Sequence, residues 1–554
     1  MVGAVMEVKP FNKGMSYALF TLLLAGYFTF VINIPFYKEL EVIFNRLDSV
    51  DLGFMVSIPI LLWAILNFLF NVFSWPRLTK PFFIVLLVCS SIVSYAGYNY
   101  GAIFDQSMMA NLFETNSSEA SAYISVYSIC WVIAIGVLPA LLIWKVALRK
   151  PQSIWRLVLS KLVSMLLSVV IFLIIATFYY QNYASVGRNN NHLQKVLIPS
   201  EFVYSLTDYL KQKYFSSPIE YRQLGLDAKQ SETALSSQNN KPTLVVFVVG
   251  ETARTQNYHL NGYPRQTNPY TEALGVVSFQ DVSSCGTATA VSVPCMFSNM
   301  THSSFDRDKA DNQDNVLDIA SRAGIDVLWL DNDGGDKDVA KNVAKRELDP
   351  KTGSQFCDGK ICYDMALLSQ FEDDVDSLTG NRLIALHLIG SHGPTYFKRY
   401  PKEMGVFQPD CQRADIENCS HEQLVNTYDN TIRYTDFMLS QTIERLKSLE
   451  DQYNTALLYV SDHGESLGED GVYLHGLPYS FAPLYQKRVP LIFWASDGFA
   501  KQKQLDMGCI QQEATQTNTF SHDNIFHSLL GIMDVETNEY DSQLDIFNHC
   551  RVNA

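Results

Sequence analysis

The chain has 554 residues, which is too long for a single hydrophobic core and predicts more than one domain. Residues 1–180 hold 11 Lys and Arg against 8 Asp and Glu, so the remaining residues carry a net charge of −18 within a total of −15. An acidic second part offers no basic face to phosphate groups, which excludes nucleic acid as the expected partner.

The first third of the chain contains five apolar stretches, at residues 16–36, 52–73, 81–103, 122–146 and 158–180. Each is long enough for a helix to cross the ~30 Å hydrocarbon core of a bilayer, which takes ~20 residues. The sequence therefore predicts a transmembrane domain of five helices over residues 1–180. The stretches contain no series of Asp, Glu or Arg of the kind that lines an ion path, which disfavours a transporter or sensor.

The charges that flank these stretches predict the orientation. Basic residues precede the first stretch and stand in the second and fourth connections: Lys9, Lys13, Arg77, Lys80, Lys145, Arg149, Lys150, Arg156 and Lys161. The third connection carries only the acids Asp105, Glu114 and Glu119. By the positive-inside rule the N-terminus is cytoplasmic, and the chain after the fifth stretch lies on the other side of the membrane.

Residues 181–240 are expected to bridge two domains. The stretch 202–215 has apolar residues near helical spacing, compatible with a helix on the membrane surface or one packed on the following domain. Residues 231–240 are rich in Ser, Gln and Asn and predict a flexible linker. From 241 to 554 short apolar runs alternate with helical patterns, which predicts an α/β domain.

The cysteines also separate by region. Cys89 and Cys130 lie in apolar stretches and are expected to be buried thiols. Six others form close pairs in the acidic part: Cys285 with Cys295, Cys357 with Cys362, and Cys411 with Cys419. Such pairs favour disulfides in an oxidising compartment over a thiolate zinc site, since no CxxC occurs. Whether Cys509 and Cys550 form a fourth bridge stays open.

Four short apolar runs in this part each end at a polar cluster. Residues 242–250 end at Glu251, residues 325–330 at Asp331, residues 382–390 at Ser391 and His392, and residues 455–460 at Ser461, Asp462 and His463. Short continuous runs are typical of strands buried on both faces of a parallel sheet. Ligands of such sheets bind beyond the carboxyl ends of the strands, where these polar side chains should converge.

A threonine turn between the first two of these strands is a candidate nucleophile site. Cys285-Gly286-Thr287 resembles a turn that leads into a helix, and a helix N-terminus favours anions such as phosphate. A threonine hydroxyl needs activation by a base or a metal ion. We expect Thr287 to be the nucleophile because Gly286 precedes it in the turn. Thr289 is the alternative.

Glu251, Asp462 and His463 are the expected metal ligands. Two carboxylates and one imidazole with an open position suit catalytic Zn²⁺, which would acidify the threonine hydroxyl and neutralise a transferred phosphoryl group. His392 and His475 are either ordinary loop residues or acid–base groups and ligands of a second zinc. His387 and His527 are expected to be core residues. Each residue alone is a weak signal; together, at four strand ends, they predict a site.

Longer motifs resemble one family. They include Val248 to Arg254, Ser284 to Ser298, Asp331 to Gly334, Gly390 to Pro394, Ser461 to Glu465, Asp470 to Gly476 and Ser521 to Asn524. The chain resembles, over its whole length, the phosphoethanolamine–lipid A transferases of Gram-negative bacteria, including the mobile colistin-resistance enzymes, in the alkaline phosphatase/sulfatase superfamily. The resemblance implies five spanning helices followed by a catalytic domain with a mainly parallel central sheet.

The resemblance also implies site residues. Thr287 would carry phosphoethanolamine and complete the zinc shell of Glu251, Asp462 and His463, while His392 and His475 would surround the substrate or a second zinc. Asn111 and Glu114 resemble residues that hold the donor headgroup. Lys337 corresponds to a substrate-proximal lysine, although the family's cysteine loop there reads Asp336 to Ala340 without cysteine.

The implied activity is zinc-dependent transfer of phosphoethanolamine from phosphatidylethanolamine to a lipid A phosphate. The enzyme would be a monomer in the bacterial inner membrane with a periplasmic catalytic domain, and it would confer resistance to polymyxins and other cationic peptides. Alternatives are transfer of phosphoethanolamine or phosphoglycerol to the lipopolysaccharide core or a periplasmic glucan, and a hydrolytic phosphodiesterase or sulfatase. A sulfatase would need a cysteine- or serine-derived nucleophile, and Cys285 is expected to be bridged.

Overall fold

The computed structural model describes residues 14–45, 50–115, 117–215, 219–235, 241–352 and 354–552. Lys9, Lys13 and the end of the predicted linker, at residues 236–240, lie outside these ranges. The chain forms two compact units. Unit 1 comprises Met1–Asp105 and Val126–Thr207, and unit 2 comprises Gln106–Ser125 and Asp208–Ala554. Packing therefore assigns residues 106–125 to the second unit, whereas the domain boundaries proposed at 180 and 240 follow the sequence.

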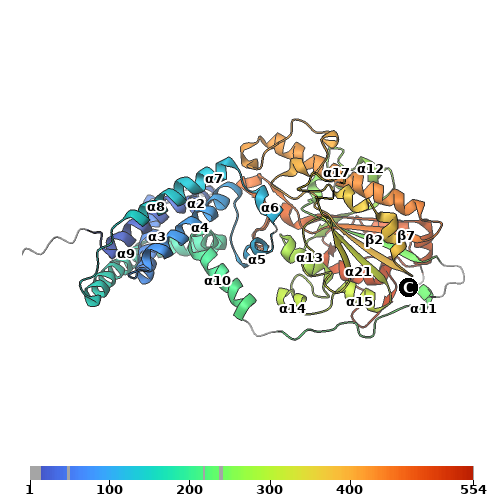
Figure 1. The fold of residues 1–554 in the computed structure, drawn as a ribbon, viewed down its shortest axis with the longest axis horizontal. Helices are drawn as coiled ribbons and strands as arrows, with labels where there is room; N and C mark the ends of the chain where they lie inside the picture. Colours follow the sequence, from blue (N-terminus) through green and yellow to red (C-terminus); the bar gives the residue numbers. More distant parts are fainter. Residues whose placement is uncertain are drawn as a thin grey trace, which may run out of the picture. The chain divides into compact units, whose positions relative to one another are not determined.

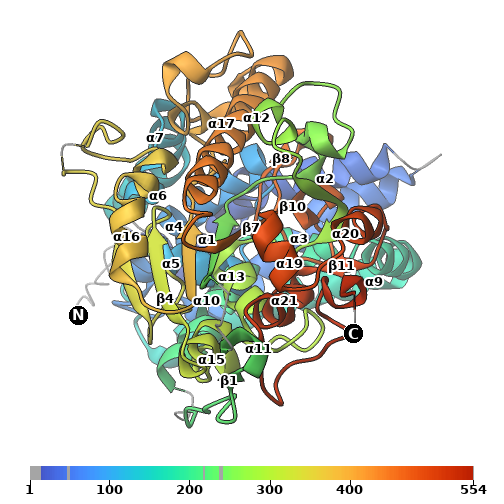
Figure 2. The same cartoon turned by 90° about the vertical axis from the view of Figure 1, so that its right-hand side faces the viewer.

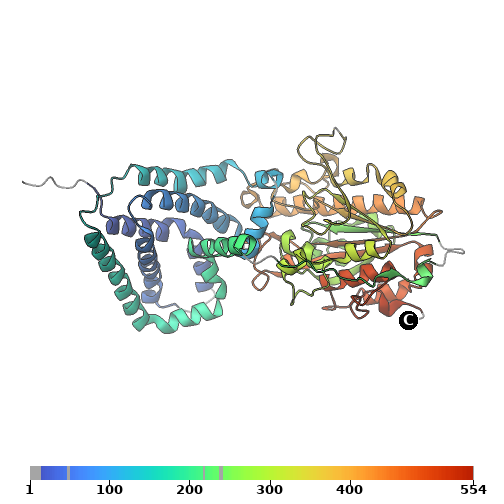
Figure 3. The same ribbon diagram turned by 60° about the horizontal axis from the view of Figure 1, so that its bottom comes forward.

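Unit 1 consists of apolar helices, drawn in blue to teal (Figure 3). They are α1 (Tyr17–Tyr27), α2 (Ile34–Phe44), α3 (Leu52–Phe73), α4 (Thr79–Tyr100), α7 (Val126–Val132), α8 (Leu138–Lys145) and α9 (Ile154–Asn189), with π-helical turns at Phe28–Ile32 and Ile133–Val137. Among the described residues, four helices are long and apolar enough to cross a membrane, or five if the bent pair α1–α2 counts as one span. This confirms the predicted helical N-terminal domain.

The surface of unit 1 is apolar. Leu162, Leu166 and Phe178 on α9 are all more than half exposed, which suits contact with lipid and not with water. Cys89 and Cys130 are exposed on the same kind of surface, so the prediction that they are buried is wrong. A lipid-facing thiol and a core thiol have the same apolar neighbours in sequence, and only the packing separates them.

Unit 2 is built on an eight-stranded sheet in the order β11-β3-β10-β7-β2-β6-β4-β5. Its strands are β2 (Thr243–Gly250), β3 (Val277–Ser283), β4 (Asp326–Asp331), β5 (Ala344–Glu347), β6 (Arg382–His387), β7 (Asn454–Ser461), β10 (Arg488–Ala495) and β11 (Phe520–Ser521). The run from β7 to β5 is parallel, while β10 is antiparallel to both of its neighbours. This confirms the predicted mainly parallel sheet.

Helices cover both faces of the sheet, as Figures 1 and 2 show. One face packs against α13 (Thr289–Phe297), α15 (Val316–Arg322) and α21 (Ile525–Ile532), whose apolar residues share one core with the strands. The other face is covered by α17 (His421–Ser448), together with α12 (Pro269–Glu272). Every residue of β2, β6 and β7 is buried, as the continuous apolar runs predicted.

Four disulfides join Cys285 to Cys295, Cys357 to Cys362, Cys411 to Cys419 and Cys509 to Cys550. The three predicted pairs are confirmed, and the fourth resolves the open question. All four lie in unit 2. The first one joins the threonine turn to Cys295 near the end of α13.

Candidate metal centre

Three buried side chains meet at the carboxyl edge of the central strands. Glu251 follows β2, while Asp462 and His463 follow β7. Gly250 pairs with Ser461 in the parallel register of these two strands, which brings the residues that follow both strands to the same level. Their ligand atoms all lie within 4.8 Å of one another, and none of the three side chains is exposed. The sequence predicted this convergence.

His463 is oriented as a neutral metal ligand. Its Nδ1 donates a hydrogen bond to the Gly464 carbonyl at 2.9 Å, so Nε2 faces the carboxylates of Asp462, 3.3 Å away, and Glu251, 3.5 Å away. Burial, and then the nearby His475, lower the pKa of His463 to about 4. The imidazole therefore keeps its lone pair at neutral pH, as metal binding requires.

Asp462 places a carboxylate next to that of Glu251 in a site without solvent. One oxygen, Oδ1, accepts hydrogen bonds from the backbone amides of Thr252 and His463. The other, Oδ2, has no hydrogen-bond partner within the described part of the chain. Burial and the neighbouring Glu251 carboxylate raise the pKa of Asp462 well above its usual range. A divalent cation would remove this repulsion and take the unpaired oxygen as a ligand.

The structure brings Thr289, and not Thr287, to this cluster. The Thr289 hydroxyl lies 3.1 Å from Glu251 Oε2 and 3.4 Å from His463 Nε2. The Thr287 hydroxyl instead donates to the Leu477 carbonyl at 2.6 Å, and its own carbonyl accepts from the Gly476 amide. Thr287 was expected at the metal ligands, but the structure places the alternative, Thr289, there.

The reason lies in where the helix begins. The turn before it is closed by two hydrogen bonds, from the Gly286 amide to Ser292 Oγ and from Ser284 Oγ to the Gly286 carbonyl. Consequently α13 starts at Thr289, with Ala288 as its N-cap, and Thr287 stays in the turn before the helix. The first turn of the helix, where backbone amides are available to an anion, therefore carries Thr289.

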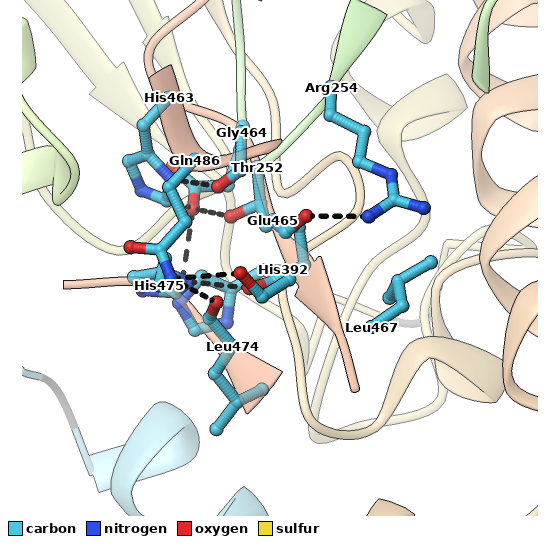
Figure 4. Close-up of polar contacts among 12 residues, drawn as sticks. Thr252, Arg254, His392, His463, Gly464, Glu465, Leu467, Leu474, His475 and Gln486 are labelled. Carbon is cyan, nitrogen blue, oxygen red and sulfur yellow. Dashed lines mark hydrogen bonds and ion pairs between the residues drawn. The ribbon is translucent and has the colours of Figure 1, made fainter. Parts of the chain in front are cut away.

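His392 and His475 border the same cluster (Figure 4). Both are nearly fully buried, and His392 Nε2 lies 4.0 Å from Glu251 Oε1. The His475 ring is centred 4.3 Å from that of His463, and its Nδ1 lies 3.4 Å from Glu465 Oε1. The predicted positions of both histidines beside the metal ligands are thus seen in the structure, while their chemical roles stay predictions.

Glu465 is a site residue that the sequence analysis did not single out. It is fully buried, and its Oε2 accepts a hydrogen bond from the Tyr396 hydroxyl at 3.0 Å. Burial raises the pKa of Glu465 to about 8, so the carboxyl holds a proton at neutral pH. Its place two residues after His463, in the run Ser461 to Glu465, was the only sequence signal.

The three predicted substrate residues lie in unit 2 on other elements. Asn111 and Glu114 belong to α5 (Gln106–Glu114), and Glu114 pairs with Arg307 at 3.5 Å. Arg307 also donates to the carbonyl of Ala290, so Glu114 connects to the first turn of α13 and not to the carboxylates themselves. Lys337 is half-buried on the loop after β4. The roles predicted for these residues stay predictions.

A cavity of about 160 Å³ adjoins His392. Its lining carries charges of both signs, from Asp331, Asp333, Glu347, Lys360 and Arg399. Such a lining suits a small ligand that is itself a zwitterion, since anionic and cationic groups would each find a partner.

His522 connects the threonine turn to the end of β7. Its Nδ1 accepts from the Cys285 amide at 3.0 Å, and its Nε2 donates to the Ser461 carbonyl at 2.9 Å. Protonation would break the first of these bonds, and burial lowers the pKa of His522 from 6.5 to about 3. His522 therefore holds the turn only as neutral imidazole.

This histidine should make the chain less stable in acid. Below pH 6.5 the unfolded chain takes up a proton at this position and the folded chain does not, so stability falls as pH falls towards 3. Between pH 6.5 and pH 3, we expect His522 to lower the free energy of unfolding by about 1.4 kcal/mol for each pH unit. Unfolding midpoints in guanidinium chloride, measured from pH 7 to pH 4.5, should fall more steeply for the wild type than for His522→Asn. Parallel curves would contradict this expectation.

A buried set of carboxylates and imidazoles at the carboxyl edge of an α/β sheet, beside a helix-borne hydroxyl, is typical of a metal-dependent phosphoryl- or sulfuryl-transfer enzyme. In agreement, the sulfatase family model matches residues 243–535, and the model for phosphoethanolamine transferase EptA/EptB matches residues 62–214.

Relatives match almost the full chain. Phosphoethanolamine transferase EptA of Escherichia coli K12 is 40% identical over 533 residues, covering 96% of each chain. Phosphatidylethanolamine transferase Mcr-1 of Escherichia coli is 35% identical over 95% of this chain and 96% of its own. The solved structure of the integral membrane lipooligosaccharide phosphoethanolamine transferase A from Neisseria meningitidis matches with a TM-score of 0.92 and 36% identity, covering 97% of this chain and 99% of that one. The chain belongs to the phosphoethanolamine transferase EptA family, which confirms the resemblance noted in its motifs.

Proposed function

We propose that this protein transfers phosphoethanolamine from phosphatidylethanolamine to a phosphate of lipid A, through a phosphorylated threonine, and that the threonine is Thr289. The observation that carries this proposal is the contact of the Thr289 hydroxyl with Glu251 and His463. The names of the relatives, phosphoethanolamine transferase EptA and phosphatidylethanolamine transferase Mcr-1, support the transferred group.

Zinc fits the donor set. Glu251, Asp462 and His463 offer two carboxylates and an imidazole nitrogen, and Thr289 adds an oxygen that completes four ligands. This number and mixture of N and O donors suits Zn²⁺, and the unpartnered Asp462 Oδ2 is the atom that an ion would satisfy. Bound there, zinc would lower the pKa of the Thr289 hydroxyl and offset negative charge on the phosphoryl group.

In the first half-reaction Thr289 Oγ1 attacks the donor phosphorus, and the bond from phosphorus to the glycerol oxygen breaks. Diacylglycerol leaves with the proton that the threonine loses. In the second half-reaction a lipid A phosphate oxygen attacks the same phosphorus, and the threonine oxygen leaves and regains a proton. His392, His475 and the protonated Glu465 lie beside the cluster, and we assign the proton movements to them.

The lining of the adjoining cavity supports phosphoethanolamine as the group carried. Glu347 supplies negative charge for the ammonium end, while Arg399 and Lys360 supply positive charge for the phosphate. Asn111, Glu114 and Lys337 are proposed to hold the lipid headgroup from the neighbouring elements.

We place the protein in the bacterial inner membrane as a monomer, with residues 1–180 spanning it, 181–240 as the bridge and 241–554 as a periplasmic catalytic domain. The asymmetric flanking charges support this orientation. Four disulfides support an oxidising compartment. Both substrates are lipids, so a membrane-held site would confine the reaction to two dimensions. The added amine would reduce the negative charge of lipid A and thereby weaken binding of polymyxins and other cationic peptides.

The test is to incubate the purified full chain in detergent with fluorescent phosphatidylethanolamine and lipid A. We expect a chelator-sensitive release of diacylglycerol, lipid A heavier by phosphoethanolamine, and a modified peptide containing Thr289 when the acceptor is left out. In expressing cells, unmodified lipid A beside a modified lipopolysaccharide core or glucan would instead assign the alternative acceptor. Release of free phosphoethanolamine with no acceptor modified would indicate a hydrolase.

A further inference from the structure

A second group of buried ligand atoms lies at the same edge of the sheet. Glu251, Asp333 and His387 present a carboxylate, a carboxylate and an imidazole whose atoms all lie within 4.8 Å of one another. The exposed fractions of the three residues are 0%, 6% and 0%. They come from neighbouring strands, because His387 ends β6 and pairs with Val249 of β2 on one side and Asp331 of β4 on the other.

The orientation of His387 is fixed by a third acid. Its Nδ1 lies 2.9 Å from Asp331 Oδ2, and that carboxylate also accepts hydrogen bonds from Trp329 Nε1 and from the Gly334 and Gly335 amides. With so many donors Asp331 is ionised and accepts the proton on His387 Nδ1. A carboxylate on one ring nitrogen is the arrangement that usually holds a metal-bound histidine in place.

The other ring nitrogen of His387, Nε2, is the atom that points to a missing ligand. Nε2 has no hydrogen-bond partner within the described part of the chain, although it is completely buried. It lies 3.7 Å from Asp333 Oδ2, too far for a hydrogen bond. A bare nitrogen lone pair that faces carboxylates in a dry site is unfavourable unless positive charge lies between them.

We propose that Glu251, Asp333 and His387 bind a second divalent metal ion, and that Glu251 bridges it to the ion held by Asp462 and His463. The imidazole ligand favours Zn²⁺ or Mn²⁺ over Ca²⁺ and Mg²⁺, which prefer oxygen ligands alone. Ions that share a bridging carboxylate are typically about 3.5–4 Å apart. This site is separate from the second zinc expected at His392 and His475, and Asp333 opens it to the adjoining cavity.

A metal ion at this site would hold the Glu251 carboxylate in place. Without an ion there, the carboxylates of Asp331, Asp333 and Glu251 lie close together around the imidazole of His387. With an ion, Glu251 would be held rigidly while one of its oxygens accepts from Thr289. The inference rests on the proposed metal centre for its shared ligand, but it does not depend on which lipid is the acceptor.

Metal counting tests the proposal without measuring activity. The full chain in detergent, with wild type and variants in parallel, is dialysed against Mn²⁺ or Zn²⁺ and the metal per chain is measured by mass spectrometry. We expect two ions for the wild type, one each for Asp333→Asn, His387→Gln and Asp462→Asn, and a loss of both for Glu251→Gln. The matched controls Asp436→Asn and His527→Gln change a buried acid and a buried histidine outside the group, and should keep two ions.

The outcomes separate the two sites. If Asp333→Asn and His387→Gln bind as much metal as the wild type, the second site is wrong. If Asp462→Asn loses no metal, the first site fails instead, and with it the proposed activation of Thr289. Anomalous scattering from crystals of the wild-type chain soaked in Mn²⁺ serves where a variant does not fold: a peak between Asp333 and His387 is expected, and its absence overturns the proposal.

Discussion

Replacing Thr289 with alanine should abolish phosphoethanolamine transfer, whereas replacing Thr287 should leave most of it. The Thr289 hydroxyl is the one that contacts Glu251 and His463, so Thr289→Ala removes the proposed nucleophile. We expect a loss on the order of 10³-fold or more in the rate of transfer. Thr287→Ala removes one hydrogen bond to the Leu477 carbonyl, which costs about 1 kcal/mol and less than tenfold in rate.

The measurement is diacylglycerol release from fluorescent phosphatidylethanolamine, together with the mass of the peptide that contains both threonines. Thr289→Ser is the matched control, because it keeps a hydroxyl at the same position and should retain measurable activity. Fragmentation of the peptide should place the phosphoethanolamine group on residue 289. An inactive Thr287→Ala beside an active Thr289→Ala would show that the hydroxyl contact seen in the structure is not the catalytic one.

Replacing Asp462 with asparagine should separate the catalytic effect of the metal from its effect on stability. The amide has nearly the shape of the carboxylate but is a weaker ligand, so zinc affinity should fall and transfer should drop by at least roughly 10²-fold. In the metal-free chain the same change removes a carboxyl that is repelled by Glu251, so the variant should be at least as stable as the wild type.

Thermal unfolding with and without zinc tests both parts of this prediction. Zinc at 100 times its dissociation constant should stabilise the wild type by about 2.7 kcal/mol for one site, and it should stabilise Asp462→Asn much less. Asp436→Asn again serves as the control, because its carboxyl is buried but lies outside the metal ligands. If zinc raises the unfolding midpoints of Asp462→Asn and wild type equally, Asp462 is not a ligand.

The sequence was sufficient for the sheet and for the convergence of Glu251, Asp462 and His463, because both follow from local patterns. An apolar run such as 455–460 indicates a strand that is buried on both faces of the sheet. The residues that follow such a strand must lie at the carboxyl edge of the sheet. The choice between Thr287 and Thr289 depends on where α13 begins, and two side-chain hydrogen bonds in the turn decide that. Such bonds leave no periodic signal.

His387 shows a second limit. Leu386 and Leu388 flank it, so the sequence predicts one continuous strand in this region. His387 is therefore predicted to be a core residue. Only the register of β6 with β2 and β4 shows that it ends the strand beside Glu251 and Asp333. The pairing of Glu114 with Arg307 was equally hidden, because 193 residues separate the two in the chain.

The assignment of residues 106–125 to unit 2 has a consequence for dissection of the protein. The chain passes between the units at 105–106, at 125–126 and at 207–208, so a single proteolytic cut after α10 (Ser200–Phe215) would separate most of unit 2 from residues 106–125, which stay attached to unit 1. A recombinant fragment that starts at residue 208 would lack α5, and Arg307 would lose Glu114 while still capping the Ala290 carbonyl. Truncation would therefore alter the surroundings of Thr289, the proposed nucleophile, even though Glu251, Asp462 and His463 are retained.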